Sequence, residues 1–172
     1  MRGEVIILEG VDKTGKSTLA KDLSALTGYP VVHLSVPPED VDYEKHLISL
    51  IAFHPDGVIF DRFHLGDYVY AGLTREEPAL SPRGFVNVER HLANRSAVIV
   101  YCWAELKDLQ RRFVEDGETL IPSSEISRLQ ARYVSILKTS ELPKVLYNFE
   151  HDSYKQNQGA EIKKRINAAR TS

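Results

Sequence analysis

One segment near the start of this chain has the residue types and spacing needed to hold a phosphate. Gly10-Val11-Asp12-Lys13-Thr14-Gly15-Lys16-Ser17 fits the pattern G-x-x-x-x-G-K-[ST]. In such a loop the glycines let backbone N–H groups turn inward around a phosphate, and the lysine ammonium reaches the terminal phosphates. The serine hydroxyl is a ligand for the Mg²⁺ that accompanies the nucleotide. The segment therefore predicts an ATP and Mg²⁺ site made of Gly10, Asp12, Lys13, Thr14, Gly15, Lys16, Ser17 and Thr18.

A second pair of reactive side chains, Asp61 and Arg62, follows the short apolar run Val58–Phe60. If that run is a strand of a parallel sheet, both side chains lie at the same edge as the loop. Asp61 could hold Mg²⁺ through water or accept a proton, and Arg62 could bridge donor and acceptor phosphates. An ion pair at a strand end, without a role in catalysis, is the alternative.

The pattern of elements around these residues indicates how they are positioned. Five short apolar runs without strict alternation are typical of strands buried on both faces of a parallel sheet. They are Val5–Leu8, Val31–Leu34, Val58–Phe60, Val98–Trp103 and Val145–Phe149. Helix-length segments with apolar stripes alternate with them, beginning with Leu19, Leu23 and Leu26. The alternation predicts a three-layer α/β fold, of the type found in P-loop NTPases, with about five parallel strands flanked by helices.

Length and composition limit the classes of protein. The 172 residues, 42% of them hydrophobic, are expected to form one domain with a substantial core that includes Phe53 and Phe63. A net charge of −2 argues against a nucleic-acid-binding protein. The longest apolar run, Ala97–Ala104, is too short to span a membrane, and no secretion signal is visible. We therefore expect a soluble cytoplasmic protein with nucleotide substrates, whose single cysteine, Cys102, is a core residue.

The chain resembles thymidylate kinases in two motifs. The first is Glu9-Gly10-Val11-Asp12-Lys13-Thr14-Gly15-Lys16-Ser17-Thr18, and the second is Asp61-Arg62-Phe63 followed by Val69-Tyr70-Ala71-Gly72. The helices around Arg111-Arg112 and Arg128–Leu137 are similar to those that flank the lid of these enzymes. The short chain with Asp61-Arg62-Phe63-His64-Leu65-Gly66 looks like a phage-encoded enzyme of this type. The resemblance implies one kinase domain over residues 1–172, a lid at about 115–123, and a homodimer formed through the helix around Phe85–Leu92.

The resemblance also implies roles for individual residues. Asp12 would hold the 3′-hydroxyl of a deoxynucleotide, Arg62 would grip its phosphate, and Tyr70 would pack against its nucleoside. The family takes a transition-state cation either from the loop or from a lid arginine. Because the expected lid has no basic residue, Lys13 is the candidate, with Arg111 and Arg112 as competing sources. The catalytic set is then Lys13, Lys16, Asp61 and Arg62, with Ser17 and Asp61 as the Mg²⁺ ligands, Asp61 through water.

The acceptor is the point at which the chain departs from these kinases. They carry Arg-Glu-Pro after the second strand, and this chain carries Ser35-Val36-Pro37-Pro38-Glu39. Arg75, Arg83 and Arg90 are candidates for the missing phosphate contact, Arg75 being nearest to the second motif. The predicted acceptor residues are Asp12, Arg62, Phe63, Tyr70 and Arg75.

Three functions are compatible with these residues. The first is phosphorylation of dTMP or a related deoxynucleoside monophosphate with ATP and Mg²⁺. The second is a deoxynucleoside kinase, in which Glu39 or Asp61 would deprotonate a 5′-hydroxyl; the missing arginine favours it. The third is an ATPase that acts as a nucleotide switch, and the absence of an Asn-Lys-x-Asp base-reading motif weighs against a GTP-driven form of it.

Overall fold

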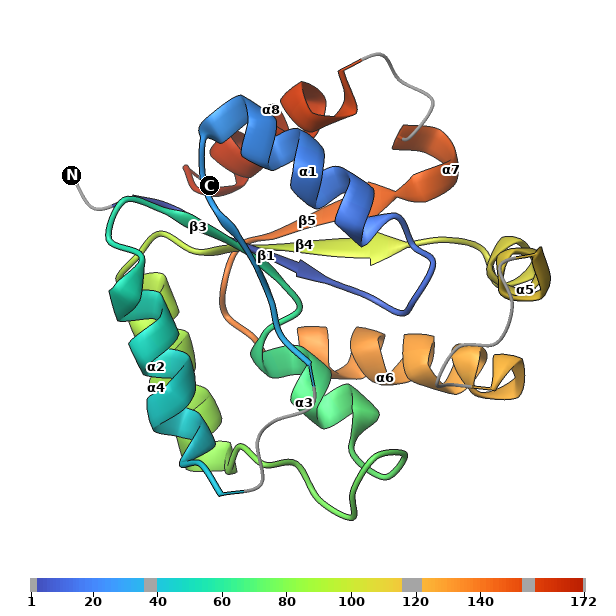
Figure 1. Cartoon of the computed structure of the whole chain (residues 1–172), viewed down its shortest axis with the longest axis horizontal. Coiled ribbons are helices and arrows are strands. Elements are labelled where there is room, and N and C mark those ends of the chain that lie inside the picture. Colours follow the sequence, from blue (N-terminus) through green and yellow to red (C-terminus); the bar gives the residue numbers. More distant parts are fainter. Residues whose placement is uncertain (1–2, 36–39, 116–121, 153–156, 172) are drawn as a thin grey trace.

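The structure is a computed structural model that describes residues 3–35, 40–115, 122–152 and 157–171. Its centre is a sheet of five parallel strands in the order β2-β3-β1-β4-β5, with helices on both sides (Figure 1). The strands are β1 (Val5–Glu9), β2 (Val31–His33), β3 (Val58–Asp61), β4 (Val98–Trp103) and β5 (Lys144–Asn148). This is the three-layer α/β fold that the sequence predicts, and the five strands lie where their apolar runs indicate.

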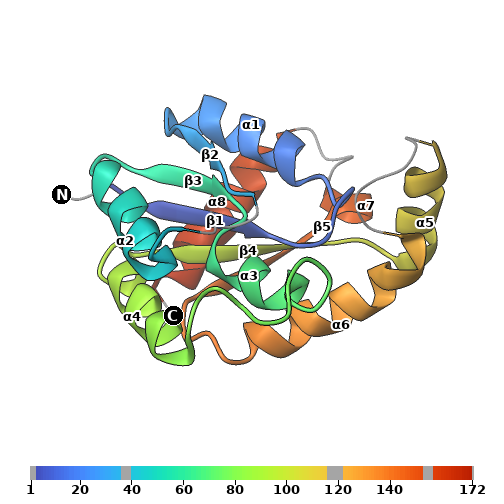
Figure 2. The same ribbon diagram turned by 60° about the horizontal axis from the view of Figure 1, so that its bottom comes forward.

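The helices form the two outer layers of the fold. They are α1 (Lys16–Thr27), α2 (Tyr43–Phe53), α3 (His64–Tyr70), α4 (Pro82–Ala93), α5 (Leu106–Glu115), α6 (Ile126–Leu137), α7 (Phe149–Asp152) and α8 (Gln158–Ala169), with a 3₁₀ turn at Ser123–Glu125. Figure 2 shows α1 on one side of the sheet and α3, α4 and α6 on the other. Both layers are needed because every residue of β1 is buried.

Alternate residues of the strands belong to two separate hydrophobic cores, one on each face of the sheet. Ile6 and Leu8 of β1 pack with Leu19 and Leu23 of α1 and Ile162 of α8. The residues that alternate with them, Val5 and Ile7, pack into a larger core on the other face of the sheet. Helices α2, α3, α4, α5 and α6 cover that core. Cys102 is fully buried in the smaller core, as expected.

The register of the sheet sets the position of the two motifs. β1 is the central strand, and it pairs with β3 from Val5↔Val58 to Leu8↔Asp61. The loop after β1 and the residues after β3 therefore leave the sheet side by side at its carboxyl edge, which is where ligands bind in open α/β sheets. The Arg62 backbone N–H also donates to Leu8 O at 2.9 Å, which holds the second motif against β1.

Some expectations from the sequence are wrong or are not covered. Phe53, expected in the core, is 80% exposed at the end of α2. The helices α3 and α7 were not expected at all. Most of the expected lid, 116–121, and Glu39 lie outside the described residues. Among the helices of the described residues, none is long and apolar enough to cross a lipid bilayer.

Candidate active site

The loop between β1 and α1 takes a backbone path that few side chains permit. Gly10 has φ 147°, and a Cβ there would lie 2.2 Å from Cys102 O on β4. Gly15 has φ 79° where it begins α1, and Lys13 adopts φ 66° as well. Left-handed conformations of this kind are unfavourable for residues other than glycine and collect at functional sites. Together they turn the chain back over the start of α1, which points its positive dipole end toward the loop.

Lys16 lies folded over this loop. Its ammonium donates to Val11 O at 2.7 Å and to Thr14 Oγ1 at 3.4 Å, and the residue is 6% exposed. Burial lowers the pKa of Lys16 to about 8, and the positive charge of Arg62 acts in the same direction. An ammonium in this position gains from a negatively charged ligand, which would replace the water that it has lost.

Two oxygen ligands meet beside the loop. Ser17 Oγ donates to Asp61 Oδ2 at 3.1 Å, and His33 Nδ1 lies 3.0 Å from the same oxygen. A hydroxyl and a carboxylate are ligands that Mg²⁺ accepts, and both lie at the mouth of the loop, so these residues fit the ion. His33 was not expected here. The sequence feature that could have identified it is its position, because it is a polar residue at the end of β2 and so lies at the same sheet edge.

A cavity of about 400 Å³ opens over these residues, and we name it the loop cavity. Its wall contains Lys16 and Asp61, the two groups of opposite charge that the two motifs were expected to bring together. The full lining is Asp12, Lys13, Gly15, Lys16, Ser17, Thr18, His33, Leu34, Asp61 and Arg62. Of the predicted ATP-binding residues, only Gly10 and Thr14 do not line it. Gly10 lies beneath it against β4, and Thr14 Oγ1 donates to Val11 O at 2.8 Å within the loop.

Arg62 joins the two motifs. It has φ 66°, and its guanidinium pairs with the Asp12 carboxylate of the loop. The same guanidinium lies over the ring of Tyr70, 4.9 Å from the centroid, in cation–π geometry. A conformation that is unusual for arginine is thus maintained by contacts on two sides.

On the other side of Arg62 lies a second cavity, of about 240 Å³, which we name the aromatic cavity. All five predicted acceptor residues line it, and they come from the loop, from the turn between β3 and α3, from α3 and from the turn after α3. The lining is Asp12, Leu34, Ser35, Tyr43, Arg62, Phe63, Gly66, Asp67, Tyr70, Leu73, Thr74, Arg75 and Pro122. Asp12, Leu34 and Arg62 belong to both cavities, so the two share a wall.

Glu9 explains why α3 begins where it does. Glu9 Oε1 accepts from Phe63 N at 3.0 Å and from Gly66 N at 3.4 Å, at the start of the helix. Its other oxygen, Oε2, accepts from the Tyr133 hydroxyl at 3.1 Å. Burial raises the pKa of this fully buried carboxyl, against the opposing effect of these donors. A carboxylate at a helix N-terminus satisfies N–H groups that have no partner in the helix.

The competing cations lie in different surroundings. Arg112 donates from Nη1 to Lys13 O at 2.8 Å and from Nη2 to Glu150 Oε1 at 2.6 Å. Arg111, its neighbour on α5, is 60% exposed and pairs with Asp108. Arg112 thus contacts the loop and Arg111 does not. Arg83 and Arg90 line neither the loop cavity nor the aromatic cavity.

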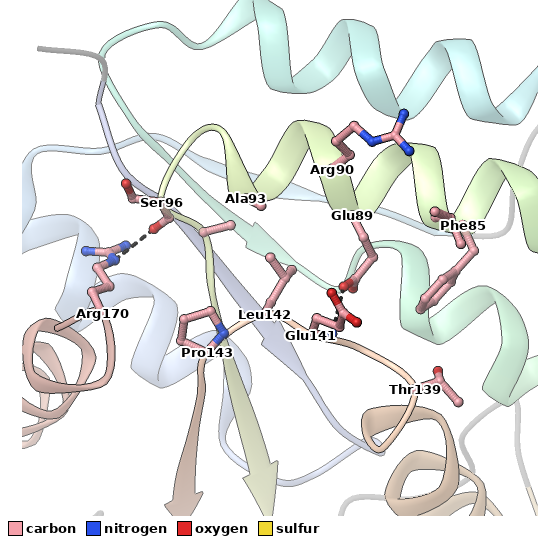
Figure 3. Close-up of a pocket in the computed structure, with 12 residues that line it drawn as sticks. Phe85, Glu89, Arg90, Ala93, Ser96, Thr139, Glu141, Leu142, Pro143 and Arg170 are labelled. Atoms are coloured by element: carbon pink, nitrogen blue, oxygen red, sulfur yellow. Dashed lines mark hydrogen bonds between the residues drawn. The ribbon is translucent and has the colours of Figure 1, made fainter. Parts of the chain in front are cut away.

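A third cavity, of about 640 Å³, lies between α4 and the chain around Leu142 (Figure 3). Glu89 on its wall accepts from Ser140 Oγ at 3.0 Å and from Glu141 N at 3.2 Å. Glu89 Oε1 also lies 2.7 Å from Nε2 of the fully buried His64 on α3. Arg90, one of the candidates for the acceptor-phosphate contact, lines this cavity, and none of the other residues predicted for the site does.

Comparison with known proteins places the fold among kinases. No protein-family model matches the chain. The SPbeta prophage-derived protein YorR of Bacillus subtilis is 28% identical over 143 residues, covering 80% of this chain and 84% of YorR. The crystal structure of YorR in complex with phosphorylated GDP matches with a TM-score of 0.77 and 25% identity, over 95% of this chain and 94% of that one.

Two enzymes of known activity share the fold at lower identity. Deoxyadenosine kinase from M. mycoides with bound dCTP has a TM-score of 0.60 and 17% identity, over 95% of this chain and 99% of that one. Thymidylate kinase from Candida albicans has a TM-score of 0.60 and 14% identity, over 98% and 94% of the two chains. The chain therefore has a P-loop kinase fold of the kind found in nucleoside and nucleotide kinases.

Proposed function

We propose that this protein is a kinase that transfers the γ-phosphoryl group of ATP to a deoxynucleoside monophosphate, dTMP or a related nucleotide, and forms the diphosphate. The observation that carries the proposal is the wall shared by the loop cavity and the aromatic cavity, in which Arg62 pairs with Asp12. A donor in one cavity and an acceptor in the other would meet at this arginine.

The loop cavity would take the triphosphate. The amides of Gly10–Thr18 and the ammonium of Lys16 would bind the β- and γ-phosphates. Ser17 would hold Mg²⁺ directly and Asp61 through water, and the ion would neutralise phosphate charge when bound. The loop cavity already contains unfavourable positive charge, since burial lowers the pKa of Lys16 to about 8. A triphosphate would remove that cost.

The aromatic cavity would take the acceptor. Tyr70 would pack on its nucleoside, Phe63 would form part of the floor, and Asp12 would hold the sugar 3′-hydroxyl. Phe63 is 2% exposed, and its ring stacks on that of Phe60 with the ring centroids 4.2 Å apart, so packing in the core fixes its position. In the reaction an oxygen of the acceptor phosphate bonds to the γ-phosphorus, and the bond from that phosphorus to the bridging oxygen of ADP breaks. Lys13 and Arg62 would stabilise the charge on the transferred group.

A deoxynucleoside kinase is the second candidate, and the absence of the Arg-Glu-Pro arginine after the second strand favours it. A deoxyadenosine kinase has the same fold over 95% of this chain. In that reaction Asp61 would accept the proton of a 5′-hydroxyl. Glu39, the other base that the sequence offers, lies outside the described residues.

A kinetic screen tests the proposal and separates the two candidates. Each common deoxynucleoside and its 5′-monophosphate is incubated with the protein, ATP and MgCl₂, and ADP formation is measured. We expect turnover with monophosphates and little with nucleosides. Lys16→Ala is expected to lose nearly all transfer while its circular dichroism spectrum stays that of the wild type. Turnover of nucleosides alone would favour the second candidate, and acceptor-independent hydrolysis would contradict both.

A further inference from the structure

The aromatic cavity contains a second arginine–aspartate pair besides Arg62 and Asp12. Arg75 Nη2 lies 2.6 Å from Asp67 Oδ1, and both residues line the cavity. Neither of them lines the loop cavity, so this pair belongs to the part of the aromatic cavity farther from the loop. If the acceptor phosphate lies at the shared wall, the opposite end of the acceptor, its base, lies toward Asp67 and Arg75.

Asp67 stabilises this end of the cavity through contacts with the backbone and with Arg75. Its Oδ1 accepts from Ala79 N at 3.1 Å and its Oδ2 from Leu80 N at 2.8 Å, in addition to the contact with Arg75. The side chain is 0% exposed. A wholly buried carboxylate with two backbone donors and an arginine ion pair has little capacity left for a ligand. Its role is to fix the guanidinium.

Arg75 has unused donors. A guanidinium carries five N–H groups, and within the described residues the only side-chain partner of Arg75 is Asp67. Its Nε is buried without a hydrogen-bond partner among those residues. Because Arg75 lines only the aromatic cavity, away from the wall shared with the loop cavity, it is placed to meet the acceptor's base and not its phosphate. It is suited to a neutral ligand that presents oxygen or nitrogen acceptors.

We propose that Arg75, fixed by Asp67, reads the acceptor base and selects bases that carry a keto oxygen at the 6-position of a purine or the 4-position of a pyrimidine. Guanine, thymine and uracil present such an oxygen, and arginine is well matched to an edge of this kind. Adenine and cytosine present an amino group at the equivalent position, whose hydrogens would face a side chain that only donates. The proposal rests on the proposed function, because it assigns the base of the same acceptor.

Two size-matched pairs of acceptors test this inference. dIMP and dAMP differ at the 6-position of a purine, and dUMP and dCMP differ at the 4-position of a pyrimidine. With saturating ATP and Mg²⁺, we expect kcat/KM for the keto member of each pair to exceed that for the amino member by about tenfold or more. In Arg75→Gln, whose amide offers an acceptor as well as donors, the ratio should fall to about one, with KM for ATP unchanged.

Two further variants keep the result interpretable. Arg75→Lys retains the charge and the pairing with Asp67 but not the planar fork, and should give an intermediate ratio. Arg83→Gln, on the exposed side of α4, should keep the wild-type ratio. A wild-type ratio near one in both pairs would overturn the inference while leaving the proposed function intact. So would equal loss for all acceptors in Arg75→Gln. No transfer to any acceptor would remove the proposed function, and the inference with it.

Discussion

Arg62 and Asp12, 50 residues apart in the sequence, form an ion pair in the wall between the loop cavity and the aromatic cavity. Arg62 sits at the end of a central strand in a left-handed conformation, and its guanidinium also covers the ring of Tyr70. A donor phosphate in one cavity and an acceptor phosphate in the other would therefore both lie next to the same guanidinium. This geometry makes Arg62 the residue whose chemistry matters most to the proposed transfer.

Arg62→Lys tests that importance. The variant keeps a positive charge but loses the planar fork that can hold two phosphates at once. We expect kcat to fall about 10²-fold while the melting temperature stays close to the wild-type value. Arg83→Lys is the control for a general effect of replacing arginine. A kcat within about threefold of wild type would show that Arg62 does not stabilise the transferred group.

The two neighbouring arginines of α5, Arg111 and Arg112, provide a test variant and its control. Arg112→Ala removes the donor to Lys13 O and the contact with Glu150, so the loop should lose its support from α5. We expect kcat/KM for ATP to fall about tenfold. Arg111→Ala, one residue away and exposed, should change it little. Equal effects of the two substitutions would mean that Arg112 acts only through the charge of the helix.

Gly10→Ala tests the tight passage of the loop past β4. A methyl group there would lie 2.2 Å from Cys102 O, and φ 147° is unfavourable for alanine. We expect the free energy of unfolding to fall by about 3 kcal/mol or more, with loss of ATP binding. Gly28→Ala is the control, since it has φ 75° with no atom near the added methyl. It should cost only about 1–2 kcal/mol. Denaturant unfolding of both variants measures the difference, and equal losses would contradict the steric explanation.

Glu89→Gln tests the buried contact between α3 and α4. Burial alone would raise the pKa of Glu89, but the hydrogen bonds from His64, Ser140 and Glu141 outweigh it and lower the pKa. A carboxyl whose pKa is lowered on folding stabilises the protein above its unfolded value of 4.5, and this contribution is lost as the pH falls through the folded value.

Stability measured against pH provides the readout for that variant. At pH 7, Glu89→Gln should lower the free energy of unfolding by about 1–3 kcal/mol. Below pH 4.5 the difference from wild type should shrink, because the wild-type carboxyl becomes protonated as well. A difference that stays constant from pH 7 to pH 3 would show that the charge of Glu89 does not contribute.

Much of the fold was predictable because it depends on local patterns. The five strands are apolar runs buried on both faces, and the loop has a pattern that only a strand–loop–helix unit satisfies. Parallel pairing then brings Lys16 and Asp61 to one edge whatever the connections are. The residues predicted to bind ATP and the acceptor lie together at this edge for this reason, and their binding and chemical roles stay predictions.

The missed features depend on contacts between distant residues. Helix α3 contains Gly66, and its start is satisfied by Glu9, more than fifty residues earlier, so nothing within the segment indicates a helix. The prediction that Phe53 is a core residue was wrong. Leu47 and Ile51 form the buried face of α2, and Phe53, two positions after Ile51, points away from that face. The pairing of Arg75 with Asp67 could not be read from spacing, since the turn after α3 decides it.

The sheet pairing of β1 with β3 has a consequence for how such a protein can change. Groups proposed to bind ATP follow two strands that are paired with each other at the centre of the molecule, so a shift of their backbone would disturb the sheet. Asp67 and Arg75 instead belong to a short helix and the turn behind it. On the proposed assignment, substitutions in this turn would change the acceptor preference and leave the ATP site as it is.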